Sequence, residues 1–185
     1  MDSFLDKLIR WWRFKKIVKY IPKDSVVCDL GCGKEASFLR NISSLIKQGI
    51  GLDAEVEDYK DLKFEFKRFK ILKEIPLEEE SCDVITLMAV LEHLSNPQEI
   101  LNETFRILKT GGKLIITTPT PLAKPLLEFL AFKLRFIDKN QIRDHKNYFW
   151  PENIKKMLLK IGFKEEKIKS DFFEFFLNSL IVATK

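Results

Sequence analysis

Hydrophobic and polar residues follow two different periods along the first half of the chain. Apolar residues recur at intervals of three and four near the N-terminus, which predicts an amphipathic helix over residues 3–20. The apolar positions of this helix are Phe4, Leu5, Leu8, Ile9, Trp12 and Phe14. A β-branched run predicts a strand over 25–30, followed by a helix over 35–47 and a second strand over 49–53. Residues 63–69 alternate phenylalanine with charged residues, which is typical of a strand with one solvated side.

The second half of the chain continues this alternation of strands and helices. Residues 82–88 are almost all apolar, as expected for a strand that is covered on both faces. A helix begins after Asn96, because Asn96 can cap it, Pro97 fits its first turn and Glu99 can reach back to the cap. Gly111 or Gly112 is expected to end this helix. The remaining elements are a strand over 113–118, a helix from Pro151 that stops at Gly162, and two strands over 163–169 and 174–184.

This order of elements predicts the fold class. Strands that alternate with helices imply right-handed βαβ crossovers and a parallel sheet with helices on both faces. Only a short turn, near Ser170-Asp171, separates the last two strands, so the final strand is expected to run antiparallel to its neighbour. We therefore predict an α/β protein with a Rossmann-like doubly wound sheet, mostly parallel with an antiparallel C-terminal strand, over a single domain of residues 1–185.

Composition and charge add few constraints. A chain of 185 residues has room for one domain, and its formal net charge of +5 is interleaved with acidic residues, which does not indicate a nucleic-acid partner. The cysteines, Cys28, Cys32 and Cys82, are odd in number, and no secretory signal precedes them, which predicts a cytoplasmic protein without a disulfide framework. Only two histidines accompany them, far apart in sequence, so no metal site is expected.

A glycine turn after the first strand carries the clearest chemical signal. Residues 26–33 read as a strand that enters the turn Gly31-Cys32-Gly33 before a helix, which is where a nucleotide cofactor binds in open α/β sheets. Asp53, at the end of the second strand, can accept hydrogen bonds from ribose hydroxyls. These features suit both NAD and S-adenosylmethionine. Asp29 favours the second, because a carboxylate repels a pyrophosphate about 4 Å away by about 4 kcal/mol and attracts a sulfonium and an ammonium group.

Several further motifs occur in the order found in one enzyme family. The chain resembles the class I S-adenosylmethionine-dependent methyltransferases, specifically the methyltransferase type 11 family, over nearly its whole length. The motifs that carry the resemblance are the glycine turn of residues 26–33, the acid Asp53, Ile75-Pro76-Leu77 through Ser81-Cys82-Asp83-Val84-Ile85, Glu92-His93-Leu94, Phe105 to Leu114 with its Gly111-Gly112 pair, and the late segment from His145 to Phe163.

The resemblance implies the seven-stranded methyltransferase fold, S-adenosyl-L-methionine as cofactor, and methyl transfer to an O, N or S atom of a small-molecule acceptor. The cofactor-binding residues that it implies are Asp29, Gly31, Cys32, Gly33, Asp53, Ala54, Leu72, Met88 and Ala89. Two features depart from the family pattern: Glu35 or Ala36 stands near the place of the third glycine, and Ile71 and Leu72 stand where an acid before the Ile75-Pro76 element often contacts adenine. A non-catalytic cofactor-binding or scaffold protein of the same fold therefore remains an alternative, with an NAD-dependent oxidoreductase as a more distant one.

The acceptor side of the site offers two candidate bases. His93 follows the strand that is expected to point at the transferable methyl group, although a histidine in such a turn is more often held by local packing. His145 belongs to a predicted substrate-cap segment over residues 120–150, next to Asp144 and Tyr148. This segment is very apolar with a few basic residues, which suits a lid packed on the core and leaves a peripheral membrane contact as the alternative. The aromatic residues of the leading helix, over residues 1–20, could instead form a homodimer contact.

Overall fold

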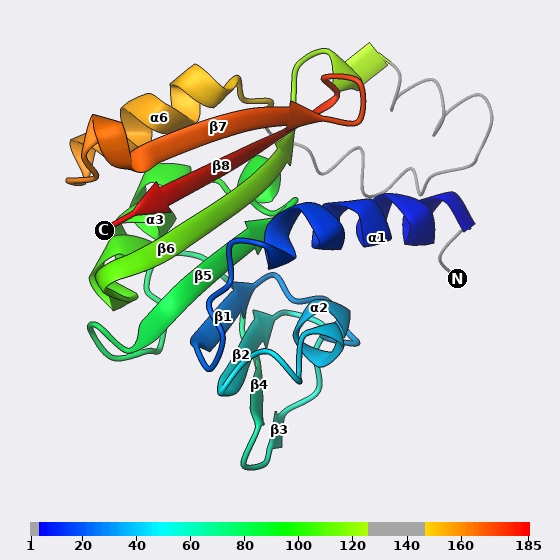
Figure 1. The fold of residues 1–185 in the computed structure, drawn as a ribbon, viewed down its shortest axis with the longest axis vertical. Helices are drawn as coiled ribbons and strands as arrows, with labels where there is room; N and C mark the ends of the chain where they lie inside the picture. The colour runs from blue at the N-terminus through cyan, green and yellow to red at the C-terminus, as the bar shows by residue number, and fades with distance from the viewer. Residues whose placement is uncertain (1–3, 126–146) are drawn as a thin grey trace.

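The structure, a computed structural model, describes residues 4–125 and 147–185, with side chains from residue 10 onward, and places its strands in one sheet. The strand order is β3-β4-β2-β1-β5-β6-β8-β7 (Figure 1). The strands are β1 (Val26–Leu30), β2 (Gln48–Asp53), β3 (Tyr59–Lys60), β4 (Phe64–Arg68), β5 (Cys82–Met88), β6 (Leu108–Pro119), β7 (Ile168–Phe173) and β8 (Asn178–Thr184). The helices are α1 (Phe4–Val18), α2 (Ser37–Asn41), α3 (Pro97–Ile107) and α6 (Pro151–Lys160), with short 3₁₀ turns η1 (Leu91–His93) and η2 (Glu165–Lys167).

Strand directions confirm the predicted topology. β1, β2, β4, β5 and β6 run parallel to one another, as right-handed crossovers require. β8 is antiparallel to both β6 and β7, which confirms the antiparallel strand at the C-terminus. The two-residue strand β3 was not predicted; it pairs antiparallel with β4 and brings the sheet to eight strands.

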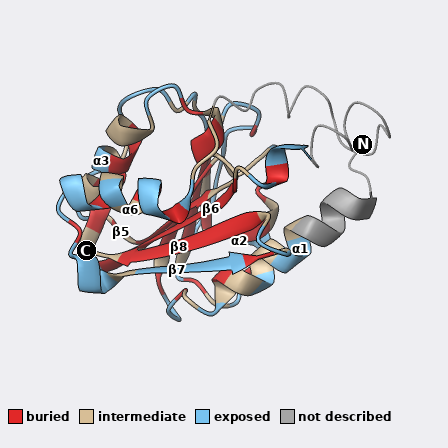
Figure 2. Cartoon of the chain, turned by 90° about the horizontal axis from the view of Figure 1, so that it is seen from above, coloured by how far each residue is buried: buried red, intermediate tan, exposed pale blue. Residues whose placement is uncertain are grey.

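Helices cover both faces of the sheet, so the sheet has two cores. On one face, α1 and α2 contribute Ile17, Phe38 and Leu39, which pack on alternate residues of the strands such as Val84 and Ile115. On the other face, α3 and α6 contribute their own apolar stripes, which pack on the intervening strand residues. Figure 2 shows the central strands buried, whereas β7 is largely exposed as the edge strand. This doubly wound arrangement leaves the carboxyl ends of β1, β2 and β5 together at one edge.

Several predicted boundaries were wrong. The turn between the last two strands lies at residues 174–177 rather than at Ser170-Asp171, because Glu174, Phe175 and Phe176 all adopt positive φ and reverse the chain there. The helix predicted over 35–47 is reduced to Ser37–Asn41. Residues 42–45 form turns instead, and Ile42 and Ile46 are nevertheless buried in the core.

The helix α3 also differs from its prediction at both ends. Asn96 makes no side-chain cap hydrogen bond, although Pro97 occupies the first turn as expected. The helix ends at Ile107, not at a glycine, because Leu108 already has extended backbone and pairs with Cys82 at the start of β6. Gly111 and Gly112 lie in a bulge of β6, before pairing resumes between Lys113 and Val84. The bulge favours glycine at residue 111, because the backbone there has a φ of +81°.

Candidate active site

The glycine turn after β1 uses all three of its N–H groups inside the protein. The N–H groups of Gly31 and Cys32 donate to the carbonyl oxygen of Leu52, at 2.8 and 3.4 Å, and the N–H of Gly33 donates to Oδ2 of Asp53 at 2.8 Å. A turn that binds pyrophosphate points such N–H groups at the phosphate oxygens. This turn therefore lacks the donors that a dinucleotide would need.

Two glycines of this turn have different surroundings. Gly31 has a φ of +78°, and a Cβ added to it would lie 2.3 Å from Cγ2 of Val90, so the segment after β5 packs directly on the turn. Gly33 has a φ of +70°, but a Cβ there would meet nothing within 4 Å. The backbone of Gly33 therefore faces open space, and a ligand could approach it closely. Cys32 points back to the sheet instead, because a Cβ on Gly51 would lie 2.9 Å from its Sγ.

Asp29 lies beneath the turn with its carboxylate fully buried. Its Oδ1 accepts a 2.6 Å hydrogen bond from the hydroxyl of Thr86 on β5. Its Oδ2 has no hydrogen-bond partner among the described residues. Desolvation by burial raises the pKa of Asp29 to about 7, although the Thr86 hydrogen bond opposes this shift, and the nearby charge of Asp53 adds to it. A cation bound over the turn would favour the ionised form of this carboxyl group.

Asp53 joins the turn to the loop that follows β4. Its Oδ1 accepts a hydrogen bond from the N–H of Glu55 at 2.8 Å, while Oδ2 holds Gly33, so each oxygen retains one lone pair for a further donor. Its carbonyl oxygen accepts a bond from the N–H of Phe69. The loop that begins there lines a groove of about 530 Å³, and Leu72, which is exposed, forms part of its wall. The neighbouring residue Ala54 is exposed beside the end of β2.

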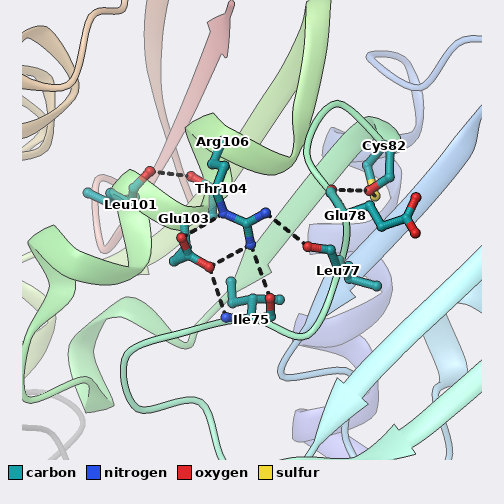
Figure 3. A network of polar contacts seen from close by, with 9 residues as sticks. Ile75, Leu77, Glu78, Cys82, Leu101, Glu103, Thr104 and Arg106 are labelled. Atoms are coloured by element: carbon teal, nitrogen blue, oxygen red, sulfur yellow. Dashed lines mark hydrogen bonds and ion pairs between the residues drawn. The ribbon is translucent and has the colours of Figure 1, made fainter.

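A pair of charged residues on α3 fixes the far side of this groove. Figure 3 shows the guanidinium of Arg106 between Glu103 and the loop. Arg106 donates to the carbonyl oxygens of Ile75 and Leu77, at 3.1 and 3.0 Å, and pairs with Glu103 at 2.7 Å. Glu103 in turn accepts a bond from the N–H of Ile75 at 3.0 Å. Arg106 and Glu103 therefore bind both carbonyl and N–H groups of the loop backbone, which fixes the position of the groove wall.

The segment after β5 brings a further carboxyl group to the same edge of the sheet. Met88 ends the strand, and Ala89 follows with a φ of +56° and an N–H that donates to the carbonyl oxygen of Thr117 at 2.8 Å. Glu92, in η1, is fully buried; its Oε2 accepts a bond from the hydroxyl of Thr118 at 3.1 Å, and its Oε1 has no partner among the described residues. Burial raises the pKa of Glu92 to about 7, against the opposing charge of Arg13.

Glu92 belongs to a small group of charges that the sequence did not single out. Burial lowers the pKa of the half-buried Arg13 on α1, whereas the charges of Glu174 and Glu92 raise it. Burial also raises the pKa of Glu174. The signal that could have identified Glu92 is its position after a fully apolar strand, where a charged side chain reaches the carboxyl edge of the sheet.

The predicted site residues can now be placed. The structure brings Asp29, Gly31 to Gly33, Asp53, Met88 and Ala89 together at the carboxyl ends of β1, β2 and β5, with Leu72 on the adjacent loop. His93 lies in η1, half-buried, next to Glu92. His145 and most of the segment 120–150 lie outside the described residues. In the part of the chain that the structure describes, no three potential metal ligands gather at one point, and no helix is long and apolar enough to cross a membrane.

The donor set of the site fits S-adenosylmethionine. A carboxylate oxygen without a partner in the described part of the chain lies under the turn Gly31-Cys32-Gly33, and this turn offers no free N–H group to a phosphate. The backbone of Gly33 faces open space beside Asp53 and the groove. A ligand with a cationic end, a diol and a flat apolar end matches this series of environments. The structure shows what stands at the two departures from the family pattern. Ala36 adopts a φ of +43°, a conformation that favours glycine. The groove near Leu72 would hold an adenine ring by packing.

Comparisons with known proteins agree with this geometry. A family model described as a methyltransferase domain matches residues 1–168. The "Probable S-adenosylmethionine-dependent methyltransferase" of Mycolicibacterium smegmatis is 32% identical over 97 residues, which make up 50% of this chain and 37% of that protein. The Ubiquinone biosynthesis O-methyltransferase of Neisseria meningitidis is 26% identical over an alignment that covers 83% of this chain and 76% of that protein.

A solved structure shows the same fold. The crystal structure of a SAM-dependent methyltransferase from Archaeoglobus fulgidus superimposes with a TM-score of 0.69 at 20% identity, over 95% of this chain and 94% of that one. At this identity the likeness shows the fold alone, whereas the family model covers most of the chain and shows the family. The chain belongs to the methyltransferase-domain family, within the class I S-adenosylmethionine-dependent methyltransferases.

Proposed function

We propose that this protein transfers the methyl group of S-adenosylmethionine to an O, N or S atom of a small-molecule acceptor. The observation that carries the proposal is the buried carboxyl group of Asp29, which has one oxygen without a partner among the described residues and lies beneath the turn Gly31-Cys32-Gly33, whose N–H groups are all used. This environment stabilises a cation, and the turn offers no free N–H group to a phosphate. It therefore supports S-adenosylmethionine over NAD.

Each part of the site has a role in this proposal. The glycine turn admits the methionine end of the cofactor, the free lone pairs of Asp53 accept the ribose hydroxyls, and the groove beside Leu72 takes the adenine. Ala54 lies beside the ribose, Cys32 supports the turn from below, and Met88 and Ala89 border the sulfonium. The bound cofactor supplies a carbon that its sulfonium leaving group already activates. The protein then has to align the acceptor, exclude water and accept a proton.

Glu92 is the residue that we assign to the proton. Its carboxyl group is buried at the edge where β5 and β6 end, and its Oε1 has no hydrogen-bond partner among the described residues. A pKa near 7 suits a group that must accept a proton at neutral pH. His93, beside it, and His145 remain candidates for the same role. Residues Met88-Ala89-Val90-Leu91 lack the Asp/Asn-Pro-Pro-aromatic clamp associated with methylation of planar amide or adenine nitrogens, which supports a small-molecule acceptor over nucleic acid.

Two measurements test this proposal. Isothermal titration of the full chain with S-adenosylmethionine, S-adenosylhomocysteine and NAD is expected to show binding of the first two alone. Transfer of tritiated methyl groups is then measured for phenols, amines, thiols and bulk tRNA, and we expect phenols to be labelled, in line with the O-methyltransferase name of one relative. Binding of NAD would overturn the proposal. Cofactor binding without transfer to any acceptor class would favour the non-catalytic alternative, and labelling of tRNA alone would overturn the small-molecule acceptor.

Three further expectations belong to the proposal. The chain acts as a single domain over residues 1–185, with residues 1–20 as a leading helix and residues 120–150 as a cap over the acceptor. It acts in the cytoplasm, where its cofactor is made. A homodimer through the aromatic residues of the leading helix is the alternative to a docking role for them, and sedimentation analysis over a range of protein concentrations tests it.

A further inference from the structure

We propose that the outer face of α1 and the tip of the β7–β8 hairpin dock on the surface of an anionic phospholipid bilayer. This aromatic–basic face consists of Trp11, Trp12, Lys15, Lys19, Phe175 and Phe176. In Figure 1 the hairpin tip and α1 lie at the same end of the sheet, where β5 and β6 end, and in Figure 2 the end of β7 again lies beside α1. The proposal concerns binding alone, so its outcome is independent of the methyl-transfer activity.

The helix α1 presents aromatic residues on the side that faces away from the sheet. Its inward side carries Ile17, which is fully buried, and Phe14, whose ring lies 5.0 Å from that of Phe38. At 100° per residue, positions 11, 12, 15, 16 and 19 share the opposite arc, which is expected to be polar in a surface helix. This arc instead exposes Trp11 and Trp12 to 49% and 46%, interleaved with lysines. Lys15 extends over the ring of Trp11, with its Nζ 4.2 Å from the ring centroid.

The hairpin tip presents two more aromatic rings. Phe175 is 88% exposed and Phe176 is 62% exposed, and both have positive φ. Hydrogen bonds hold this conformation, because the N–H of Leu177 donates to the carbonyl oxygen of Glu174, and the Thr120 hydroxyl donates to the carbonyl oxygen of Phe176 at 2.8 Å. The fold therefore holds two phenylalanines outward at a backbone cost, and a contact with an apolar phase would offset this cost.

A groove joins the helix to the hairpin. It has a volume of about 450 Å³ and is lined by Trp12, Lys15, Lys16, Lys19, Phe173 and Glu174. Lys16 pairs with Asp171 at 3.0 Å, which leaves the charges of Lys15 and Lys19 at the rim of a largely apolar groove. Lysines that flank aromatic rings in this way place their ammonium groups at the level of lipid phosphates while the rings enter the interface.

The chemistry of the face favours a bilayer over RNA or a protein. Its cations are lysines, which act as point charges toward many phosphates, rather than arginines, whose planar forks suit individual phosphates and bases. Its most exposed apolar residues are two adjacent phenylalanines at a protruding turn, a shape that inserts into an interface better than it complements a flat protein surface. A bilayer occupant also needs no pocket for a specific side chain.

Vesicle co-sedimentation of the full chain tests the proposal. We compare vesicles of phosphatidylcholine with vesicles that contain about one third phosphatidylglycerol, and expect partitioning about tenfold stronger on the anionic vesicles. Raising NaCl from about 0.1 M to about 0.5 M is expected to abolish most of this difference. In a Trp150→Phe background, Trp11 and Trp12 are the remaining tryptophans, so quenching of their fluorescence by brominated lipid reports whether this face enters the bilayer.

Matched variants separate this face from the rest of the surface. Lys15→Glu with Lys19→Glu is expected to lower anionic partitioning at least tenfold. Lys67→Glu with Lys70→Glu, an equal charge change on exposed residues in and just after β4, is expected to lower it less than threefold. Phe175→Ser with Phe176→Ser is expected to reduce binding to both vesicle types, and Leu62→Ser, which alters a fully exposed leucine at the β3–β4 turn, is the control. Circular dichroism verifies that each variant folds.

Three results would overturn the proposal. The first is equal partitioning to neutral and anionic vesicles, and the second is an equal loss with the control charge reversals. The third is displacement from anionic vesicles by equimolar tRNA, which would assign the face to RNA.

Discussion

The hydroxyl of Thr86 donates a 2.6 Å hydrogen bond to Oδ1 of Asp29, and the two residues are direct neighbours in the β1–β5 register. The bond satisfies one carboxylate oxygen and leaves the other buried without a partner in the described part of the chain. Thr86 is itself fully buried, so its hydroxyl has few alternatives. Burial raises the pKa of the Asp29 carboxyl group in this pair to about 7, so the group is close to half-protonated at neutral pH.

The variant Asp29→Asn is expected to weaken S-adenosylmethionine binding while making the free protein more stable. The amide removes the charge that stabilises the cationic cofactor, which we expect to cost about 1–3 kcal/mol of binding free energy. The same change removes a buried ionisable group, and at pH 8 the free energy of unfolding is expected to rise by on the order of 1–2 kcal/mol. Calorimetric titration and urea denaturation measure the two effects. A variant with lower stability and unchanged affinity would contradict the role of Asp29.

The affinity for S-adenosylmethionine is expected to depend on pH through Asp29. The pKa of the carboxyl group rises from its usual 3.8 to about 7 in the folded protein, so folding favours its neutral form. The stability due to this group is therefore full below about pH 4 and is lost as the pH rises to about 7. A bound cation favours the ionised form instead, so the dissociation constant is expected to fall between about pH 5.5 and about pH 7.5. The slope should be absent in Asp29→Asn.

Alanine at the two glycines of the turn is expected to have separable effects. Gly31→Ala places a methyl group 2.3 Å from Cγ2 of Val90 at a positive φ, so we expect a loss of about 2–4 kcal/mol of stability. Gly33→Ala meets no protein atom within 4 Å and is expected to cost only about 1–2 kcal/mol of stability, from its φ. It is nevertheless expected to abolish cofactor binding, because its methyl group would occupy the space of the ligand. The double variant Gly31→Ala with Val90→Ala is expected to recover part of the lost stability.

Removal of the proton acceptor is expected to affect turnover and not cofactor binding. Glu92→Gln keeps the shape and an acceptor for the Thr118 hydroxyl but cannot take a proton, so we expect methyl transfer to fall about 100-fold or more. The rate of the unmodified protein is expected to rise with pH through about 7, because Glu92 must be ionised to act as a base. Burial places this rise near neutral pH by raising the pKa of Glu92, and the charge of Arg13 opposes the shift. A comparable loss in His93→Gln, with full activity in Glu92→Gln, would move the role to the histidine.

The Glu103–Arg106 pair, which holds the groove loop, offers a test of the proposed adenine site. Arg106→Ala removes donors to two loop carbonyl oxygens, which is expected to cost about 1–3 kcal/mol of stability and to weaken cofactor binding severalfold. Lys155→Ala removes a surface ion pair between α6 and Glu165 and is the control, with little expected change in stability and no change in affinity. If both variants bind the cofactor equally well, the groove has no part in binding it.

Much of the fold followed from local patterns. The apolar run of β5, the alternation in β4 and the turn glycines after β1 specified their elements, because each pattern buries one set of side chains and exposes another. The sequence determined the ends of helices and strands less well where a segment could adopt two conformations. Gly111 and Gly112 could end a helix or form a bulge, and the pairing of Leu108 with Cys82 decided for the bulge. The position of the last turn depended on Thr120, which is more than fifty residues away from Phe176.

The sequence by itself determined which residues gather at the site. The carboxyl ends of parallel strands meet at one edge, so Asp29 and Asp53 had to lie close to the glycine turn. Only the tertiary structure decided the state of these groups. It showed that Leu52 and Asp53 use the N–H groups of the turn, and that Asp29 and Glu92 are desolvated and titrate near neutral pH. Burial and hydrogen-bond partners come from segments distant in the chain, and these set the free energy of a charge.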